Sequence, residues 1–219
     1  MKAIFVAGTG TDLGKTHVAC ALLRAACARG MRVDAFKPVV SGFDPDAPDD
    51  SDPARLALAL GRPEAWREVS PRRYRAPLAP NIAARLEGDT LQMDDLVSDC
   101  RDWLSKRDVD LALIEGAGGV MSPMTDAATN LDLMSALGLP VMLVAGSYLG
   151  TASHLLTALE VVRARGLAIA AIVVSESPDA PDLDQTLDLL RAFEQRAPIL
   201  AAPRAPSWDA GALVNALRS

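Results

Sequence analysis

The sequence predicts an α/β fold in which a mostly parallel central sheet is covered by helices on both faces. Six short apolar runs alternate with longer segments of helical periodicity. Such runs are typical of strands buried on both faces, and strands that alternate with helices form βαβ units. The expected strands are residues 3–7, 33–36, 111–114, 141–145, 168–174 and 198–201, and the main expected helices are residues 14–29, 92–106, 151–165 and 182–196. We therefore expect a single three-layer domain over residues 1–219.

Composition and charge place the chain among cytoplasmic enzymes or binding proteins. It has 219 residues, half of them hydrophobic, with a formal charge of −6 and a pI of about 4.9. An acidic chain is a poor partner for nucleic acids, because binding to their phosphates depends on Lys and Arg. No signal-type segment opens the sequence and no run of about 20 apolar residues occurs, so we expect no membrane association. The three cysteines and two histidines lack the spacing of metal ligands.

Residues 8–16, GTGTDLGKT, form a glycine-rich segment between the first expected strand and the first expected helix. This position and the ending Gly14-Lys15-Thr16 are typical of a phosphate-binding P-loop, although Gly8 stands one position earlier than in the usual spacing. In such a loop, backbone N–H groups and the helix dipole attract phosphate. The lysine contacts the β- and γ-phosphates, and the hydroxyl contacts Mg²⁺. The expected fold is therefore of the P-loop NTPase type.

Two further charged residues are expected at the same edge of the sheet. Glu115 ends the third expected strand in LALIEGAGG, and Lys37 follows the second in FKPVVSG. Open parallel sheets bind ligands beyond the carboxyl ends of their strands, so both side chains should lie near Lys15. The carboxylate is suited to hold a metal ion. The second cation suits phosphoryl transfer, in which negative charge builds up.

The motifs GTGTDLGKT, KPVVSG, EGAGG and LGTASH, in this order, resemble those of the dethiobiotin synthetases of biotin biosynthesis. The resemblance covers residues 1 to about 175, and that family carries the same additional residue in its P-loop. It implies a homodimeric ligase that uses ATP and Mg²⁺ to join CO₂ or bicarbonate to 7,8-diaminononanoate. The ureido ring closes through a carbamate and a carbamic–phosphoric anhydride, with release of ADP and phosphate.

The resemblance also implies roles for individual residues. Those implied in catalysis are Lys15, Lys37 and Thr11, and those implied for Mg²⁺ are Thr16, Asp52 and Glu115. Those implied for ATP are Gly8, Asp12, Leu13, Gly14, Lys15, Thr16, Glu115, Gly116, Gly118 and Ser175. Those implied for the diamine are Thr11, Lys37, Ser41 and, from the partner subunit, the positions equivalent to Gly150, Thr151, Ala152 and Ser153. We expect the additional P-loop residue to carry Thr11 and Asp12 beyond the γ-phosphate, so that one loop contacts both reactants.

The sequence departs from the family pattern at three places. Ser175 stands where an Asn commonly contacts adenine, so we expect weaker discrimination between ATP and other nucleoside triphosphates. Gly10 and Asn81 stand where Asp and His are common.

Two other classes of protein share parts of the pattern. A cobyrinate amidase-type amidotransferase would need a glutaminase domain, for which 219 residues leave no room. A partitioning or septum-positioning ATPase of the deviant Walker type would carry an additional lysine early in the P-loop, where this chain has Thr9, Gly10 and Thr11.

Overall fold

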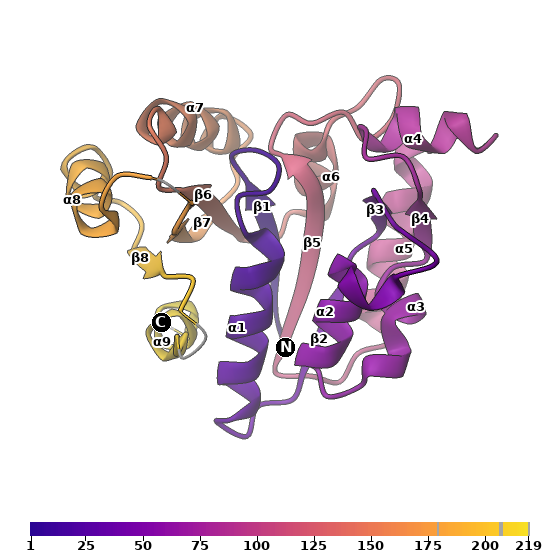
Figure 1. Cartoon of the computed structure of the whole chain (residues 1–219), viewed down its shortest axis with the longest axis horizontal. Coiled ribbons are helices and arrows are strands. Elements are labelled where there is room, and N and C mark those ends of the chain that lie inside the picture. The colour runs from indigo at the N-terminus through magenta and orange to yellow at the C-terminus, as the bar shows by residue number, and fades with distance from the viewer. Residues whose placement is uncertain (179, 206–207, 219) are drawn as a thin grey trace.

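The computed structural model describes residues 1–178, 180–205 and 208–218, and its centre is a six-stranded sheet (Figure 1). The sheet consists of β1 (Lys2–Gly8), β2 (Val33–Phe36), β5 (Leu111–Gly119), β6 (Val141–Gly146), β7 (Ile169–Ser175) and β8 (Ile199–Ala202). The strand order is β2-β5-β1-β6-β7-β8, and every neighbouring pair is parallel. All six expected strands are therefore confirmed. The sequence did not predict the short parallel pair β3 (Val39–Ser41) and β4 (Arg72–Tyr74), because three residues are too few to show a pattern.

Helices occupy the connections between the strands. They are α1 (Lys15–Cys27), α2 (Asp52–Ala59), α3 (Trp66–Val69), α4 (Pro80–Leu86), α5 (Met93–Ser105), α6 (Asn130–Leu137), α7 (Thr151–Ala164), α8 (Leu183–Phe193) and α9 (Gly211–Arg218). Short 3₁₀ turns are formed by Pro48–Asp50 and Pro63–Ala65. The four expected helices are confirmed to within three residues at each end. Among the residues described, no helix combines the length and apolar character needed to cross a membrane.

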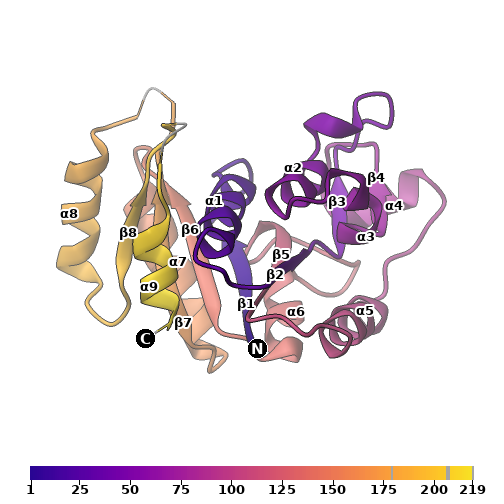
Figure 2. The ribbon, with the colours of Figure 1, turned by 90° about the horizontal axis from the view of Figure 1, so that it is seen from below.

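The two faces of the sheet are covered by different helices, which confirms the three-layer fold. Along β1, Ile4 and Val6 belong to a buried cluster with residues of α1, α2 and α9. Phe5 and Ala7 belong to a second cluster with residues of α5, α6, α7 and α8. Figure 2 shows α1 and α6 on opposite sides of the sheet. Alternate side chains of one strand therefore enter two cores, and each fully buried Leu or Ile contributes roughly 1.5–3 kcal/mol.

Strand β5 is longer than the sequence predicts, so Glu115 does not end it. The strand continues through EGAGG to Gly119, and Glu115 pairs with Val6 while Gly119 pairs with Gly8. An irregularity in the register separates these two pairs. Glycines are rare within strands, which is why the sequence pattern indicated an end at Glu115. Here they let β5 run beside the start of the P-loop.

Helix α8 ends at Phe193, three residues before its expected end, and Glu194 is the cause. The backbone of Glu194 is extended, and its carboxylate turns back to accept the N–H groups of Arg196 and Ala197 at 2.6 and 3.0 Å. Its other oxygen accepts Nη1 of Arg163, on α7, at 2.8 Å. One carboxylate therefore joins α7 to the turn that leads into β8. These contacts hold the pKa of Glu194 below its usual value, chiefly through Arg163.

We predict that Glu194→Gln lowers the free energy of unfolding by about 1.5–3 kcal/mol at pH 7, because an amide cannot replace both sets of charge-assisted hydrogen bonds. The pKa of Glu194 is lower in the folded chain than in the unfolded chain, so its contribution is present above about pH 4.5 and is lost as the pH falls below that value. Urea unfolding at pH 7 and at pH 3.5–4.5 measures this. Glu160→Gln, the same change at an exposed position of α7, is the control. An equal effect of both substitutions at pH 7 would contradict the assignment.

Candidate functional site

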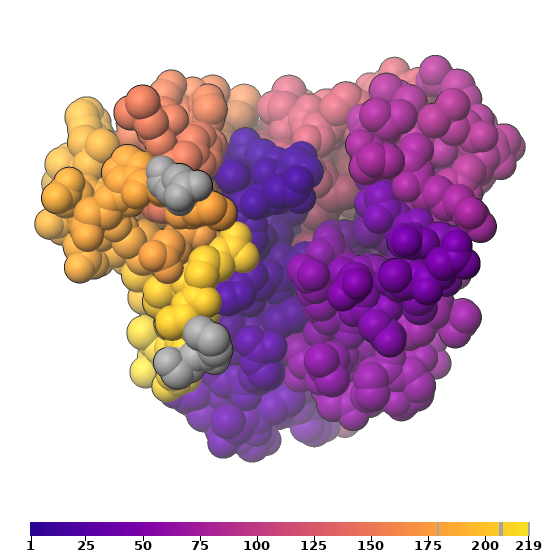
Figure 3. All heavy atoms as spheres, viewed as in Figure 1, coloured from indigo at the N-terminus to yellow at the C-terminus, as the bar shows by residue number. Residues whose placement is uncertain are grey.

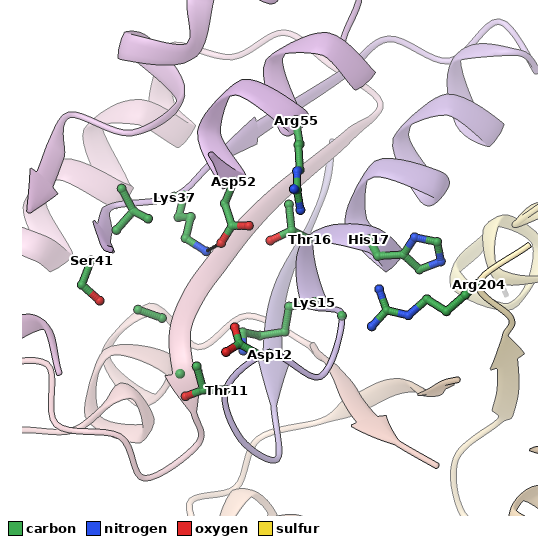
Figure 4. Close-up of a pocket in the computed structure, with 14 residues that line it drawn as sticks. Thr11, Asp12, Lys15, Thr16, His17, Lys37, Ser41, Asp52, Arg55 and Arg204 are labelled. Atoms are coloured by element: carbon green, nitrogen blue, oxygen red, sulfur yellow. Dashed lines mark hydrogen bonds and ion pairs between the residues drawn. The ribbon is translucent and has the colours of Figure 1, made fainter. Parts of the chain in front are cut away.

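The functional residues gather at the carboxyl edge of three neighbouring strands, β2, β5 and β1. They line a cavity of about 320 Å³. Its lining residues are Thr11, Asp12, Gly14, Lys15, Thr16, His17, Lys37, Val40, Ser41, Asp52, Arg55, Ala117, Gly118 and Arg204 (Figure 4). In Figure 3 the surface is hollowed between the indigo segment of the P-loop and the purple segment that carries α2 and β3. The sequence led us to expect Lys37 and Glu115 beside Lys15; Lys15 and Lys37 line this cavity together with Asp52, whereas Glu115 does not line it.

The P-loop turns into α1 at Gly14, which is left-handed with φ 93°. A Cβ at this position would lie 2.5 Å from Oγ of Ser175, so both the backbone angle and the space require glycine. The helix begins at Lys15, one residue after its expected start, and its first three residues line the cavity, where the free N–H groups of a helix N-terminus favour an anion. Asp12 is the only non-glycine residue with positive φ, 56°, among those described. The additional residue of the loop is thus accommodated by a left-handed turn directly before Leu13.

The ammonium group of Lys15 is positioned to bind an anion. Its ammonium donates to the carbonyl oxygen of Gly10 at 2.9 Å, within its own loop. Burial and, to a smaller extent, the nearby charge of Lys37 lower the pKa of Lys15 to about 8. A bound phosphate would stabilise the ammonium form and raise this pKa. Protonation of Lys15 and binding of phosphate therefore favour each other.

Glu115 connects two other residues of the site through one carboxylate oxygen. The side chain is 1% exposed, and its Oε1 accepts both Oγ1 of Thr16 at 2.6 Å and Nζ of Lys37 at 2.6 Å. The other oxygen, Oε2, is buried without a hydrogen-bond partner. Lys37 makes a second ion pair, of 2.7 Å, with Oδ2 of Asp52 at the start of α2. Residues from β5, α1, α2 and the segment after β2 therefore meet within hydrogen-bond distance.

The charges of this cluster support one another. Burial opposes the charged form of Lys37, but the carboxylates of Glu115 and Asp52 raise its pKa above the usual value. Burial likewise opposes the charge of Asp52, and Lys37 more than compensates, so the pKa of Asp52 is lowered. Lys37 thus stays a cation even without a ligand.

A second cavity, of about 620 Å³, adjoins the first. Thr11, Asp12, Val40, Ser41, Asp52, Ala117 and Gly118 line both cavities. The second cavity is closed on its far side by Pro77, Leu78, Ala79 and Pro80 and by Ser122 and Pro123. The exposed side chains of Thr11 and Asp12 form part of the wall that the two cavities share.

Other residues assigned from the sequence lie outside both cavities. Ser175 is fully buried, with its hydroxyl against Gly14 and without a hydrogen-bond partner. Its predicted contact with the base therefore stays a prediction. Gly8, Leu13, Glu115 and Gly116 do not line either cavity, although Glu115 reaches the first one through Thr16 and Lys37. The residues Gly150, Thr151, Ala152 and Ser153 begin α7 away from these cavities, and Thr151 donates its hydroxyl hydrogen to the carbonyl of Gly146 at 2.6 Å.

Three cationic or aromatic residues of the first cavity were not expected from the sequence: His17, Arg55 and Arg204. Burial lowers the pKa of His17, and Arg204 and Arg24 lower it further; its ring stacks on Trp208 with centroids 5.6 Å apart. Arg204 donates its Nε–H to the carbonyl of Glu176 at 3.0 Å. Arg55 follows Asp52 by three residues on a helix, a spacing that places both on one face and could have been recognised in the sequence.

This arrangement defines a P-loop nucleotide-binding protein, and solved structures share the fold. The hydrogenase maturation factor HypB from Archaeoglobus fulgidus superposes with a TM-score of 0.58 at 14% identity, covering 100% of this chain and 89% of that one. The MinC:MinD cell division protein complex of Aquifex aeolicus gives a TM-score of 0.56 at 12% identity, covering 100% and 86%. At these identities the likeness concerns the fold alone.

The sequence comparisons are more specific. The AAA domain family matches residues 2–209. The ATP-dependent dethiobiotin synthetase BioD of Caulobacter vibrioides strain NA1000 is 85% identical over 99% of both chains. The enzyme of the same name from Methylobacterium nodulans is 43% identical over 97% of this chain and 98% of its own. The chain belongs to the dethiobiotin synthetase family, which confirms the resemblance found in the sequence and decides against the amidotransferase and the partitioning ATPase.

We predict that Lys37→Met lowers the free energy of unfolding by about 3–5 kcal/mol, because it leaves the buried carboxylate of Glu115 without its cation. The double variant Lys37→Met/Glu115→Gln should recover part of the loss, since the uncompensated charge is then removed. Chemical denaturation in the absence of nucleotide and metal measures both. Lys106→Met, at an exposed position, is the control. A loss below about 1 kcal/mol in the single variant would show that Glu115 does not need this partner.

Proposed function

We propose that this protein is an ATP-dependent dethiobiotin synthetase, a ligase of biotin biosynthesis. Its substrates are 7,8-diaminononanoate, CO₂ or bicarbonate, and ATP, and its products are dethiobiotin, ADP and phosphate. One observation carries the proposal beyond family membership: two adjoining cavities share a wall formed by the P-loop residues Thr11 and Asp12. One cavity presents the cations for a triphosphate, and the other offers room for the acceptor.

The chemistry proceeds in three steps. One amine of the substrate attacks CO₂, forms an N–C bond and loses a proton, which gives a carbamate. An oxygen of the carbamate attacks the γ-phosphorus of ATP, and the bond to the β-phosphate oxygen breaks with release of ADP. The second amine attacks the carbonyl of this mixed anhydride, loses a proton and expels phosphate, which closes the ring. Ring closure gains from proximity, because both amines belong to one molecule.

The residues act mainly by position and charge. Lys15 contacts the β- and γ-phosphates, and Lys37 stands beside it on the side of Ser41 (Figure 4). Lys37 stabilises the charge that develops on the transferred phosphoryl group, and its ion pairs with Glu115 and Asp52 fix its position before substrate binds. Thr11 and Ser41 face both cavities and orient the carbamate. Catalysis therefore depends on the alignment of the reactants and on positive charge more than on a strong general base.

The oxygen atoms around Lys37 fit a magnesium ion. Mg²⁺ takes oxygen ligands, often one or two carboxylates together with water and phosphate oxygens. Thr16, Asp52 and Glu115 provide such oxygens, and Oε2 of Glu115 is buried with no partner. Within the described residues no group of three or more His, Cys, Asp or Glu side chains is placed for a metal, in keeping with an ion that binds together with the triphosphate. When bound, Mg²⁺ would neutralise charge on the phosphates.

The proposal includes a cytoplasmic homodimer. In this arrangement the N-terminus of α7, with Gly150, Thr151, Ala152 and Ser153, receives the substrate carboxylate of the partner subunit's site. A helix N-terminus is suited to a carboxylate because its free N–H groups and dipole favour negative charge. The family resemblance supports this part, as does the position of these residues outside their own chain's two cavities.

The central experiment measures dethiobiotin formed from diaminononanoate, bicarbonate, Mg²⁺ and ATP. Lys37→Ala, compared with the unchanged protein at a temperature where circular dichroism shows both folded, should lower kcat by about 10²–10³-fold, because the charge of Lys37 acts on the transferred group. Lys15→Ala should instead weaken nucleotide binding. No dethiobiotin from the unchanged protein, or ATP hydrolysis that ignores diamine and bicarbonate, would overturn the proposed reaction. Full activity of Lys37→Ala would overturn the role of Lys37.

Metal dependence offers a separate test of Asp52. We predict that Asp52→Asn raises the Mg²⁺ concentration for half-maximal activity at least about tenfold, since a carboxylate ligand becomes a weaker amide. Activity is measured as a function of free Mg²⁺ at fixed ATP. Asp49→Asn, in the same acidic loop but outside both cavities, is the matched control. The same Mg²⁺ requirement in both variants would remove Asp52 from the metal site.

A further inference from the structure

Arg55 lies in the nucleotide cavity without a partner. It stands on α2, one turn after Asp52, and its exposed side chain forms part of the cavity wall. Its backbone N–H donates to the carbonyl of Ser51 within the helix, but its guanidinium group makes no hydrogen bond or ion pair in the part of the chain that the structure describes. Figure 4 shows its guanidinium group extended toward Thr16. An arginine held at a cavity wall with all its guanidinium donors free is suited to bind an anion.

The nearest acid on the helix is already engaged. Asp52 and Arg55 are three residues apart and lie on one helix face, a spacing at which opposite charges commonly pair. Oδ2 of Asp52 instead accepts Lys37 at 2.7 Å. In Figure 4, Asp52 lies between Lys37 and Arg55. Lys37 thus neutralises the acid, and the positive charge of Arg55 remains available to a ligand.

The order of residues along the cavity indicates which part of the ligand Arg55 meets. Ser41 and Lys37 lie at the end shared with the second cavity, and His17 and Arg204 lie at the opposite end (Figure 4). Arg55 is between them, opposite Thr16 at the start of α1. In a P-loop the backbone before this helix cradles the α- and β-phosphates, while the γ-phosphate extends toward the acceptor. Arg55 therefore faces the part of ATP that leaves as ADP.

We propose that Arg55 is a nucleotide-binding residue that contacts the α- and β-phosphates and holds ATP and ADP equally. This inference rests on the proposed ATP site and adds to it a cation outside the P-loop. A contact made alike to ATP, to the transition state and to ADP changes affinity and leaves the chemical step unaltered. Arg55 is thereby distinguished from Lys37, which acts on the transferred group.

The test is a titration of the full chain with Mg·ADP and with a non-hydrolysable Mg·ATP analogue, by calorimetry. Arg55→Gln should weaken both affinities by a similar factor, about tenfold, and raise KM for ATP while kcat stays within about threefold. The affinities of Arg55→Lys should lie between those of the unchanged protein and those of Arg55→Gln, because lysine keeps the charge but lacks the planar guanidinium group. Arg24→Gln is the matched control: Arg24 is exposed on α1 and close enough to influence His17, yet it is absent from the cavity wall. It should leave both affinities within about twofold.

The outcomes are distinct. Unchanged affinity for both nucleotides in Arg55→Gln would overturn the inference, as would equal losses in Arg55→Gln and Arg24→Gln. A fall in kcat with unchanged ADP affinity would also overturn it, since it would place Arg55 on the transferred phosphoryl group. The ADP titration needs no diamine, so it decides the role of Arg55 even if the protein forms no dethiobiotin. Circular dichroism and thermal unfolding of each variant confirm that the fold is retained.

Discussion

The buried ion pair between Glu115 and Lys37 is the interaction on which the rest of the site depends. A carboxylate that is 1% exposed is stable only if its charge is compensated at close range, so Lys37 is required structurally before it is required chemically. The same carboxylate oxygen accepts Thr16, and Lys37 extends the contact to Asp52. Four segments that are far apart along the chain are thereby connected by hydrogen bonds and ion pairs. These contacts link the first residues of α1 and α2 to β5.

The two lysines of the site differ in how their charge is maintained. Lys37 has permanent carboxylate partners, so its charge does not depend on a ligand. Lys15 is buried with only a carbonyl partner, and near pH 8 its ammonium form is easily lost in the free protein. A bound triphosphate would supply the negative charge that stabilises the ammonium form of Lys15. One cation is therefore part of the folded structure, and the other becomes fully effective only in the complex, which ties its contribution to the presence of nucleotide.

Much of this organisation could be predicted because it follows from local rules. Apolar runs identify the six strands, and the rule that ligands bind beyond strand ends brings Lys37 and Glu115 to the P-loop. Asp52 needed the family, since the acidic loop offers five aspartates of equal appearance between Asp44 and Asp52. The continuation of β5 could not be predicted because its glycines are poor strand formers, and the close approach of Gly119 to the P-loop backbone is a tertiary contact that strand propensity does not contain. His17 and Arg204 were missed for a related reason: they meet only after the segment beyond β8 has folded back on α1.

The contact between the end of β5 and the P-loop also joins the two binding cavities mechanically. A Cβ at Gly119 would lie only 3.1–3.2 Å from backbone atoms of Gly10 and Thr9, so the two segments touch main chain to main chain. The N–H of Gly119 is held by Ser122, which lines the second cavity. A displacement of the P-loop backbone would therefore have to be shared by the wall of the second cavity or would break this contact. Thermodynamic reciprocity then applies: whatever factor ATP imposes on the affinity for the diamine, the diamine imposes on the affinity for ATP.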